Sequence, residues 1–219
     1  MQIINPSPFS SFLDGGNFQI VSSSPERLIK LSKNILSTRP IAGTRPRGTT
    51  QREDELMRSS LISNEKERAG HMMLIDLERN DMGKICQYGT VQVDEFMGIE
   101  NYSQVIHIVS NIIGKIKPDC GRYEVLKALF PGGTITGVPK TRAMEIIEQL
   151  EVEKRGPYTG SLGYISFSGD LDFNILIRTL FLNDKIGFIQ TGAGIVADSI
   201  PQKEFEETLQ KAEALFKAV

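Results

Sequence analysis

The segment from Tyr102 to Ile116 is apolar on both of its faces when it is drawn as a β-strand. The two faces carry alternating side chains, with Val105, His107 and Val109 on one and Ile106, Ile108 and Ile112 on the other. A strand with two apolar faces is covered on both sides, so this segment predicts a central strand. His107 then points into the interior, either as a core side chain with one hydrogen-bond partner or as part of a site.

The other segments with strand character are short and are separated by turn residues: 17–23, 27–32, 34–39, 89–96, 160–168, 172–182 and 186–196. Helical spacing predicts helices over 52–62, 64–78, 123–130, 141–150 and the C-terminal residues after Pro201. Residues 1–16 and 38–48 have the composition of turns and loops. Because strands outnumber helices and hairpins join them, the sequence predicts a mostly antiparallel α+β fold.

Composition excludes several classes of partner. The 219 residues are 40% hydrophobic and 24% charged, as in a globular protein of one large or two small domains. The net charge of -2 provides no basic field for nucleic acid, and no apolar run approaches a membrane span. Residues 1–9 lack the pattern of a signal peptide, and Cys86 and Cys120 form no metal or disulfide pattern. We therefore expect a cytoplasmic protein without nucleic-acid or membrane partners.

A glycine-rich run over residues 192–199 leads directly into the C-terminal helix. Ser199 and Gln202 have the spacing of a capping box, and Glu204 and Glu207 project from one side of the first turns. Backbone donors beside paired carboxylates can hold an anionic ligand through a hard cation such as Mg²⁺. The simpler interpretation is that the acidic residues favour the helix N-terminus through the helix dipole.

Two helices carry apolar residues at helical spacing, which predicts their buried faces. These residues are Ala69, Met72, Met73 and Leu77 in the first helix, and Phe205, Leu209, Ala212 and Phe216 in the second. Gly70 interrupts the first helix, at a cost of about 1 kcal/mol relative to Ala. No neighbouring residue explains it.

Three further features suggest anion binding. Arg178 lies in the middle of the predicted strand 172–182, and an Arg among apolar neighbours is seldom buried without an anionic partner. The basic loop 38–48 either binds a carboxylate or is a solvated surface loop. The glycine loop 131–140 precedes a helix whose first N–H groups could bind an anion.

Five motifs, in this order, resemble the chorismate-utilising enzymes, in the branch of the large subunits of anthranilate synthase and 4-amino-4-deoxychorismate (para-aminobenzoate) synthase. The motifs are Thr38–Gly48 (TRPIAGTRPRG), Leu74–Asp81 (LIDLERND), Gly132–Lys140 (GGTITGVPK), Gly163–Tyr164 with Asp172–Thr179, and Gly192–Ser199. The usual chain of the family is about twice as long, and this sequence resembles its C-terminal half. We treat residues 1–219 as one chorismate-binding catalytic domain.

The resemblance implies an α/β sandwich of two packed, mostly antiparallel sheets flanked by helices. It also implies a Mg²⁺-dependent amination of chorismate, with ammonia supplied by a glutamine amidotransferase subunit. The metal ion would hold the ring carboxylate and assist departure of the C4 hydroxyl as a Lewis acid.

The resemblance also assigns roles to residues. The metal ligands would be Glu67, Glu204 and Glu207. The substrate would be bound by Arg178, Tyr164, Gly43 and the backbone of Gly192, Ala193 and Gly194. The catalytic residues would be His107, Thr44 and Lys140. One dianionic ligand with a cation would satisfy Glu204, Glu207, Arg178 and His107 together.

Two positions depart from the family pattern. Members that attack chorismate with a lysine have P-I-K-G-T, whereas this chain has Ala42, so direct attack by ammonia is expected. The family motif R-A-E-H reads Arg68-Ala69-Gly70-His71 here, so one metal-site carboxylate is missing. Gly70 should therefore weaken Mg²⁺ binding and turnover.

Few residues of this chain distinguish the two branches of the family. Gly132–Gly137 resembles the para-aminobenzoate branch, whereas Ala42 resembles anthranilate synthase. We favour synthesis of 4-amino-4-deoxychorismate, with anthranilate synthase component I as the alternative. A third alternative is an impaired homologue that only binds a ligand or a partner.

Overall fold

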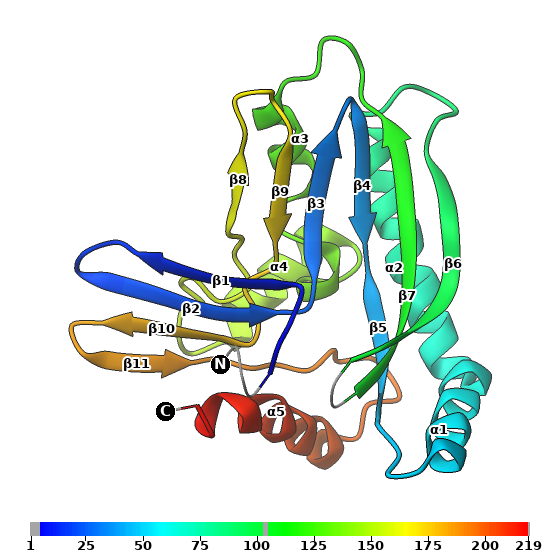
Figure 1. The fold of residues 1–219 in the computed structure, drawn as a ribbon, viewed down its shortest axis with the longest axis vertical. Helices are drawn as coiled ribbons and strands as arrows, with labels where there is room; N and C mark the ends of the chain where they lie inside the picture. Colours follow the sequence, from blue (N-terminus) through cyan, green and yellow to red (C-terminus); the bar gives the residue numbers. More distant parts are fainter. Residues whose placement is uncertain (1–4, 103–104, 219) are drawn as a thin grey trace. The chain divides into compact units, whose positions relative to one another are not determined.

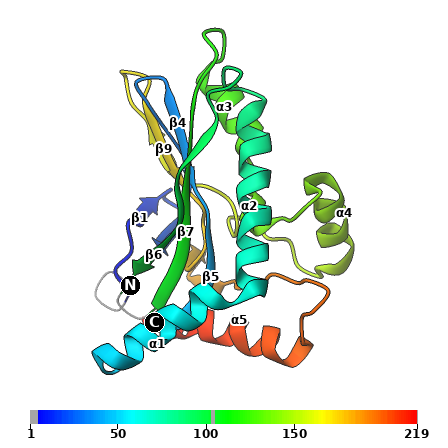
Figure 2. The same cartoon turned by 90° about the vertical axis from the view of Figure 1, so that its right-hand side faces the viewer.

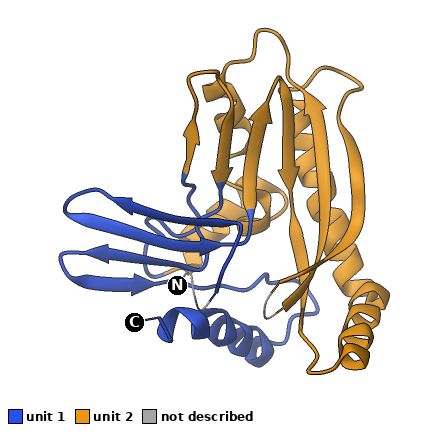
Figure 3. Cartoon of the chain, viewed as in Figure 1, with its two compact units in different colours: residues 1–26, 152–162, 174–219 blue, residues 27–151, 163–173 orange. Residues whose placement is uncertain are grey.

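The structure, a computed structural model, describes residues 5–102 and 105–218. The chain divides into two compact units, coloured separately in Figure 3. Unit 1 comprises residues 1–26, 152–162 and 174–219, and unit 2 comprises residues 27–151 and 163–173. Each unit is built around one antiparallel sheet with flanking helices, so the predicted α+β class is confirmed. A single domain over residues 1–219 stays a prediction.

The sheet of unit 2 has the strand order β5-β7-β4-β3-β9-β8, and β6 also pairs with β7 (Figure 1). Its strands are β3 (Arg27–Ser32), β4 (Ile35–Arg39), β5 (Ile41–Pro46), β6 (Gln92–Asn101), β7 (Val105–Lys115), β8 (Gly163–Ile165) and β9 (Leu171–Asn174). Strand β7 pairs with β6 on one edge and with β5 and β4 on the other. Ile106, Ile108 and Ile112 of β7 are buried, which confirms the predicted central strand.

The helices of unit 2 are α1 (Gln51–Ser63), α2 (Glu65–Gly83), α3 (Arg122–Leu129), the short 3-10 helix η1 (Gly133–Ile135) and α4 (Lys140–Leu150). Helix α2 packs against β5 and β7 and follows the long axis of that sheet (Figure 2). The side chain of Asn64 caps α2 by accepting a hydrogen bond from the N–H of Glu67, as the sequence predicted. No helix of the described residues is long and apolar enough to cross a membrane.

The buried face of α2 differs from the predicted apolar stripe. Met72 and Met73 are 40% and 42% exposed, and of the four predicted residues only Leu77 is buried. The buried face instead contains His71, Glu78 and Asp81 together with apolar residues. These polar side chains can be buried because other segments of unit 2 supply their partners, such as Ser110 Oγ at 2.8 Å from His71 Nε2.

The sheet of unit 1 has the order β1-β2-β10-β11, and α5 (Pro201–Phe216) belongs to the same unit. Its strands are β1 (Phe9–Asp14), β2 (Phe18–Ser24), β10 (Thr179–Asn183) and β11 (Ile186–Ile189). Residues 9–14, which the sequence placed among turns, pair with β2 along their whole length. Pairing with a distant or neighbouring strand can therefore override a turn-rich local composition.

The predicted strand 172–182 is two strands in two different sheets. Strand β9 belongs to the sheet of unit 2, and β10 belongs to the sheet of unit 1. Arg178 lies in the bend just before β10 with φ at 52°, so the prediction of a mid-strand Arg was wrong. A non-glycine residue in the left-handed region costs roughly 1–2 kcal/mol, which the surrounding structure must offset.

Helix α5 also turns a different face inward from the one predicted. Phe205, Leu209 and Phe216 are exposed, and of the predicted residues only Ala212 is buried. The inward stripe consists of positions at i, i+3, i+4 and i+7, namely Thr208, Lys211, Ala212 and Leu215. Polar bonds fix this orientation, because the carbonyl of Thr208 accepts from Thr191 Oγ1 and that of Lys211 accepts from Arg178 Nη1.

A buried polar cluster lies between α2 and the first residue of α4, Lys140. Glu78 and Asp81 are almost inaccessible to solvent, and Lys140 Nζ lies 2.6 Å from Asp81 Oδ2. Burial raises the pKa of Glu78 to about 7, and the charge of Asp81 acts in the same direction. Lys140 and the N–H of Gly133 act in the opposite direction. Glu78 is therefore partly protonated at neutral pH.

We predict that Glu78→Gln makes the protein relatively more stable at high pH. A carboxyl whose folded pKa exceeds its ordinary 4.5 favours folding at low pH and loses that contribution as the pH rises from about 4.5 to 7. A neutral amide has no such loss, so the stability of the variant relative to wild type should rise by about 1–3 kcal/mol between pH 4.5 and 8. Urea unfolding at both pH values measures the difference. The exposed Glu145→Gln serves as control, and parallel curves for all three proteins would refute the prediction.

Candidate functional site

The backbone of β5 brings Thr44 and Gly43 against His107. Residues 41–46 were expected to lie in a basic loop, but they form a strand with a register shift between Ala42 and Thr44. Thr44 pairs with His107 across the two strands. His107 Nδ1 lies 3.0 Å from the carbonyl oxygen of Gly43 and 3.2 Å from Thr44 Oγ1. His107 is 7% exposed, which confirms its predicted interior position.

Glu67 lies beside this pair of strands. Its Oε1 is 3.2 Å from Arg45 Nη1 of β5. A Cβ added to Gly43 would stand 3.2 Å from Glu67 Oε2 and 2.9 Å from Leu61 Cδ1, and Gly43 has φ at 67°. Only glycine meets both requirements without strain. The structure thus groups four of the predicted site residues in unit 2: Gly43, Thr44, Glu67 and His107.

Gly70 lies within the uninterrupted helix α2, one turn after Glu67. A Cβ added to Gly70 meets no atom within 4 Å, so packing does not require glycine at this position. The next residue, His71, is fully buried, and this burial lowers its pKa to about 4. His71 is therefore neutral at physiological pH.

Lys140 and Tyr164 of unit 2 occupy other places. Lys140 bonds to Asp81 and to the carbonyl of Leu129 in the cluster described above. Tyr164 lies on the short strand β8, pairs with Asp172 and has 62% of its surface exposed. The described residues give neither side chain a hydrogen bond to Thr44 or His107. The catalytic role of Lys140 and the binding role of Tyr164 stay predictions.

In unit 1, Arg178 bonds to the backbone of α5. Its Nη1 donates to the carbonyl of Lys211 over 2.9 Å. Burial lowers the pKa of the Arg178 guanidinium, and the negative charge of Glu207 partly offsets this effect. Among residues 5–102 and 105–218, no carboxylate lies within ion-pair distance of Arg178. A half-buried guanidinium of this kind can accept a carboxylate ligand.

The glycine run and the start of α5 enclose a cavity of about 410 Å³ within unit 1. It is lined by Ala193, Ile195, Val196, Ser199, Pro201, Glu204, Phe205 and Thr208. Ser199 Oγ accepts from the N–H of Val196, and Ile200 is the N-cap without a side-chain bond, so the predicted capping box was wrong. Ala193 and Glu204 therefore face one cavity, whereas the other predicted site residues of unit 1, Arg178, Gly192, Gly194 and Glu207, are not among its lining residues.

Glu207 and Gly192 are connected through Lys211. Lys211 Nζ lies 2.5 Å from Glu207 Oε1 and donates to the carbonyl of Gly192 over 2.9 Å. Glu207 thus bonds to a residue one turn later on α5. The predicted common orientation of Glu204 and Glu207 is not seen in these contacts.

The sequence pattern does not identify Tyr158 as a residue of the candidate site. A Cβ added to Gly192 would stand 2.9 Å from the hydroxyl of Tyr158, and the guanidinium of Arg155 lies over its ring at 5.8 Å. Tyr158 also contributes to the electrostatic environment of Arg178. The segment 152–162 has no periodic pattern, so no local signal pointed to this residue.

The donor chemistry of the predicted metal ligands suits Mg²⁺. Mg²⁺ prefers oxygen donors, usually takes one or two carboxylates and keeps several waters. Glu204 lines the cavity of unit 1, whereas Glu67 and Glu207 bond to Arg45 and Lys211. Within the described residues, no three acidic, His or Cys side chains converge at metal-binding distance. The metal-binding role of Glu67, Glu204 and Glu207 therefore stays a prediction.

Comparison with known proteins gives a consistent result. The sequence pattern of the chorismate binding enzymes matches residues 1–217. Anthranilate synthase component 1 of Aquifex aeolicus is 52% identical over 219 residues, which are 100% of this chain and 44% of that protein. Aminodeoxychorismate synthase component 1 of Bacillus subtilis is 52% identical over 216 residues, which are 99% of this chain and 46% of that protein.

A solved structure shares the fold. The crystal structure of anthranilate synthase component I from Streptococcus pneumoniae matches with a TM-score of 0.89 and 43% identity. The match covers 97% of this chain and 47% of that chain. This chain thus spans a little under half the length of the relatives that it matches.

We predict that Gly70→Glu raises both stability and Mg²⁺-dependent ligand binding. The site is open and helical, so a better helix former should add about 0.5–1 kcal/mol to the free energy of unfolding. The new carboxylate would also stand one turn after Glu67. Thermal unfolding and Mg²⁺ titrations in the presence of chorismate measure the two effects. Gly70→Ala is the matched control and should change stability alone; equal Mg²⁺ affinity in both variants would contradict a metal role for this position.

Proposed function

The chain belongs to the chorismate binding enzyme family, and from this premise we propose that it aminates chorismate to 4-amino-4-deoxychorismate. In the overall reaction a C–N bond forms between ammonia and C4, the C4–O bond breaks, and the hydroxyl leaves as water. Mg²⁺ is the proposed cofactor, and a glutamine amidotransferase subunit is the proposed ammonia donor. The observation that carries the proposal is Arg178, a half-buried cation that donates a hydrogen bond to the backbone carbonyl of Lys211.

Arg178 would anchor the enolpyruvyl carboxylate of chorismate. Its guanidinium presents several donors in a planar fork, of which one is used by the carbonyl of Lys211. The backbone of Gly192–Gly194 would offer N–H groups to the same carboxylate. A Cβ at Gly192 would stand 2.9 Å from the hydroxyl of Tyr158, so glycine avoids a close contact at this end of the run.

His107 and Thr44 would act near the departing hydroxyl. The carbonyl oxygen of Gly43 can only accept a hydrogen bond, so the nitrogen that faces it, His107 Nδ1, carries the proton. Nε2 is then the ring nitrogen that can hold a proton during the reaction. The bond to Gly43 fixes this tautomer before the substrate binds.

The residue of unit 1 that would hold the proposed metal ion is mainly Glu204; Glu207 and Glu67 stay ligands that only the family resemblance assigns. When bound, the ion supplies Lewis-acid stabilisation of negative charge on the ring carboxylate. Glu204 supports this role because it lines the cavity beside the glycine run. Because Ala42 provides no nucleophile, the nitrogen of ammonia must attack directly.

Synthesis of anthranilate is the second candidate. The relatives named aminodeoxychorismate synthase and anthranilate synthase are equally similar to this chain, at 52% identity each. Ala42 favours anthranilate synthase, whereas Gly132–Gly137 favours the para-aminobenzoate branch. Gly70 favours the third candidate, a homologue that binds the ligand but turns it over slowly.

Product analysis separates these candidates. The chain is incubated with chorismate, ammonium chloride and MgCl₂, and the products are identified by chromatography and mass spectrometry. We expect 4-amino-4-deoxychorismate. Anthranilate would support the second candidate, and tight chorismate binding without any product would support the third.

We predict that Arg178→Ala weakens chorismate binding by on the order of 10- to 100-fold with little loss of fold. A charge-assisted hydrogen bond to a carboxylate contributes roughly 1.5–3 kcal/mol. Calorimetric titration measures the affinity, and circular dichroism checks the fold. Arg142→Ala, which removes an exposed cation on α4, is the control and should bind normally. An unchanged affinity in Arg178→Ala would rule out the anchoring role.

A further inference from the structure

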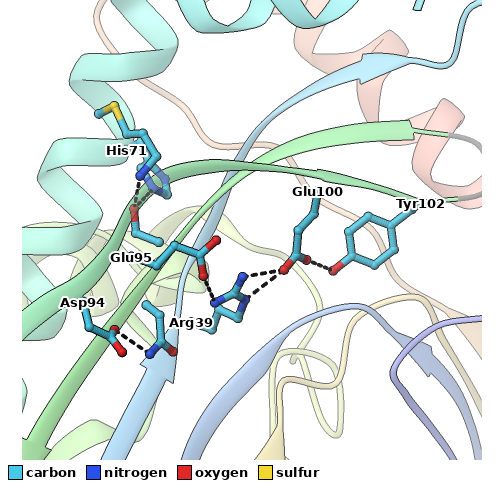
Figure 4. Close-up of polar contacts among 9 residues, drawn as sticks. Arg39, His71, Asp94, Glu95, Glu100 and Tyr102 are labelled. Carbon is cyan, nitrogen blue, oxygen red and sulfur yellow. Dashed lines mark hydrogen bonds and ion pairs between the residues drawn. The ribbon is translucent and has the colours of Figure 1, made fainter.

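A chain of contacts runs from Arg39 to His107 within unit 2, and none of its members except His107 belongs to the predicted site. Glu100 and His107 are paired across β6 and β7. Tyr102 follows β6 immediately. Figure 4 shows Arg39, Glu100 and Tyr102 in a continuous row of hydrogen bonds.

The side chain of Tyr102 makes two contacts, one through its hydroxyl and one through its ring. Its hydroxyl donates to Glu100 Oε2 over 2.8 Å. Its ring lies against the imidazole of His107 in an edge-to-face arrangement, with centroids 5.3 Å apart. This is the geometry that aromatic pairs prefer. The phenol therefore links Glu100 to the imidazole through one hydrogen bond and one ring contact.

Arg39 fixes the position of Glu100. Its Nε donates to Glu100 Oε1 over 3.1 Å, its Nη2 donates to the same oxygen, and its Nη1 lies 2.6 Å from Glu95 Oε2. Burial opposes the charge of Arg39, but the bonds to Glu95 and Glu100 keep the pKa of this guanidinium above its ordinary value. Glu100 thus has one oxygen bound by Arg39 and the other bound by Tyr102.

The opposite edge of the imidazole is held by the backbone. His107 Nδ1 faces the carbonyl of Gly43, as described above. That bond selects the tautomer, and Thr44 Oγ1 lies 3.2 Å from the same nitrogen. The ring of Tyr102 contacts the imidazole edge to face, so the imidazole is contacted at Nδ1 and by a second aromatic ring.

We infer that Tyr102 is a positioning residue for His107, and that Glu100 and Arg39 hold it in place. The inference rests on the proposed function, because it gives His107 the role of moving a proton. Tyr102 does not itself touch the reacting atoms in this account. Its contribution is to keep Nε2 aimed in one direction, since misplacing a reacting group by about 1 Å can cost on the order of 100-fold in rate.

Tyr102→Phe tests the inference because it keeps the ring and removes the bond to Glu100. The control is Asp94→Asn, which alters another cross-strand polar pair of β6 and β7, in which Asn111 Nδ2 donates to Asp94 Oδ1 over 2.6 Å. The chain contains two histidines, so ¹⁵N NMR of the imidazoles gives two sets of signals, and a His107→Gln variant assigns them.

We expect wild type and Asp94→Asn to show His107 as a sharp Nδ1–H tautomer. In Tyr102→Phe the signals should broaden or shift towards a mixture of tautomers. The turnover number with chorismate and ammonium should fall by about 10- to 100-fold, while the KM for chorismate stays within about twofold of wild type. If Tyr102→Phe does not fold, Glu100→Gln replaces it, and we expect changes in the same direction.

The inference would be overturned if the His107 signals of Tyr102→Phe were identical to those of Asp94→Asn. If Glu100→Gln is used in place of Tyr102→Phe, the same comparison applies to it. Absence of chorismate binding in wild type would instead refute the proposed function. The NMR comparison decides the positioning claim in either case, because it needs no substrate.

Discussion

The pairing of strand β7 with three other strands is the interaction on which unit 2 depends. β6 follows one edge, and β5 and β4 share the other, so β7 has partners on both edges. Two buried polar residues of β7 lie on its two faces: Ser110 on the face of Ile106, Ile108 and Ile112, and His107 on the other. Ser110 is hydrogen-bonded to His71 of α2, and His107 donates a hydrogen bond to the carbonyl of Gly43 in β5. The same strand therefore holds the sheet together and supports the candidate site.

Close approach of backbone to side chain explains several residues of the candidate site. Gly43 has no space for a Cβ beside Glu67 and Leu61, and Gly192 has none beside Tyr158. At Gly70 the space is open, so that glycine is not required by packing. The family resemblance explains Gly70 as a lost carboxylate, and the structure is compatible with restoring one. The presence of glycine at these positions is thus explained by different physical reasons.

Much of the fold follows from local sequence, whereas several site contacts do not. The apolar faces of residues 105–115 predict a central strand, and Asn64 predicts the start of α2. The buried face of α2 could not be predicted, because His71 and Asp81 are buried only through partners distant in sequence. The break of the strand at Arg178 could not be predicted either, because it arises where β9 and β10 join two different sheets. The family resemblance located Thr44, Glu67 and His107, but it assigned no role to Tyr102 or Tyr158.

We propose that this chain recognises chorismate through a metal ion as well as through Arg178. Calorimetric titration of the wild-type chain with chorismate, once in MgCl₂ and once in excess EDTA, tests this proposal. We expect binding in both conditions and an affinity at least about tenfold higher with Mg²⁺, which corresponds to about 1.4 kcal/mol. Equal affinities in the two conditions, or no binding in either, would contradict it.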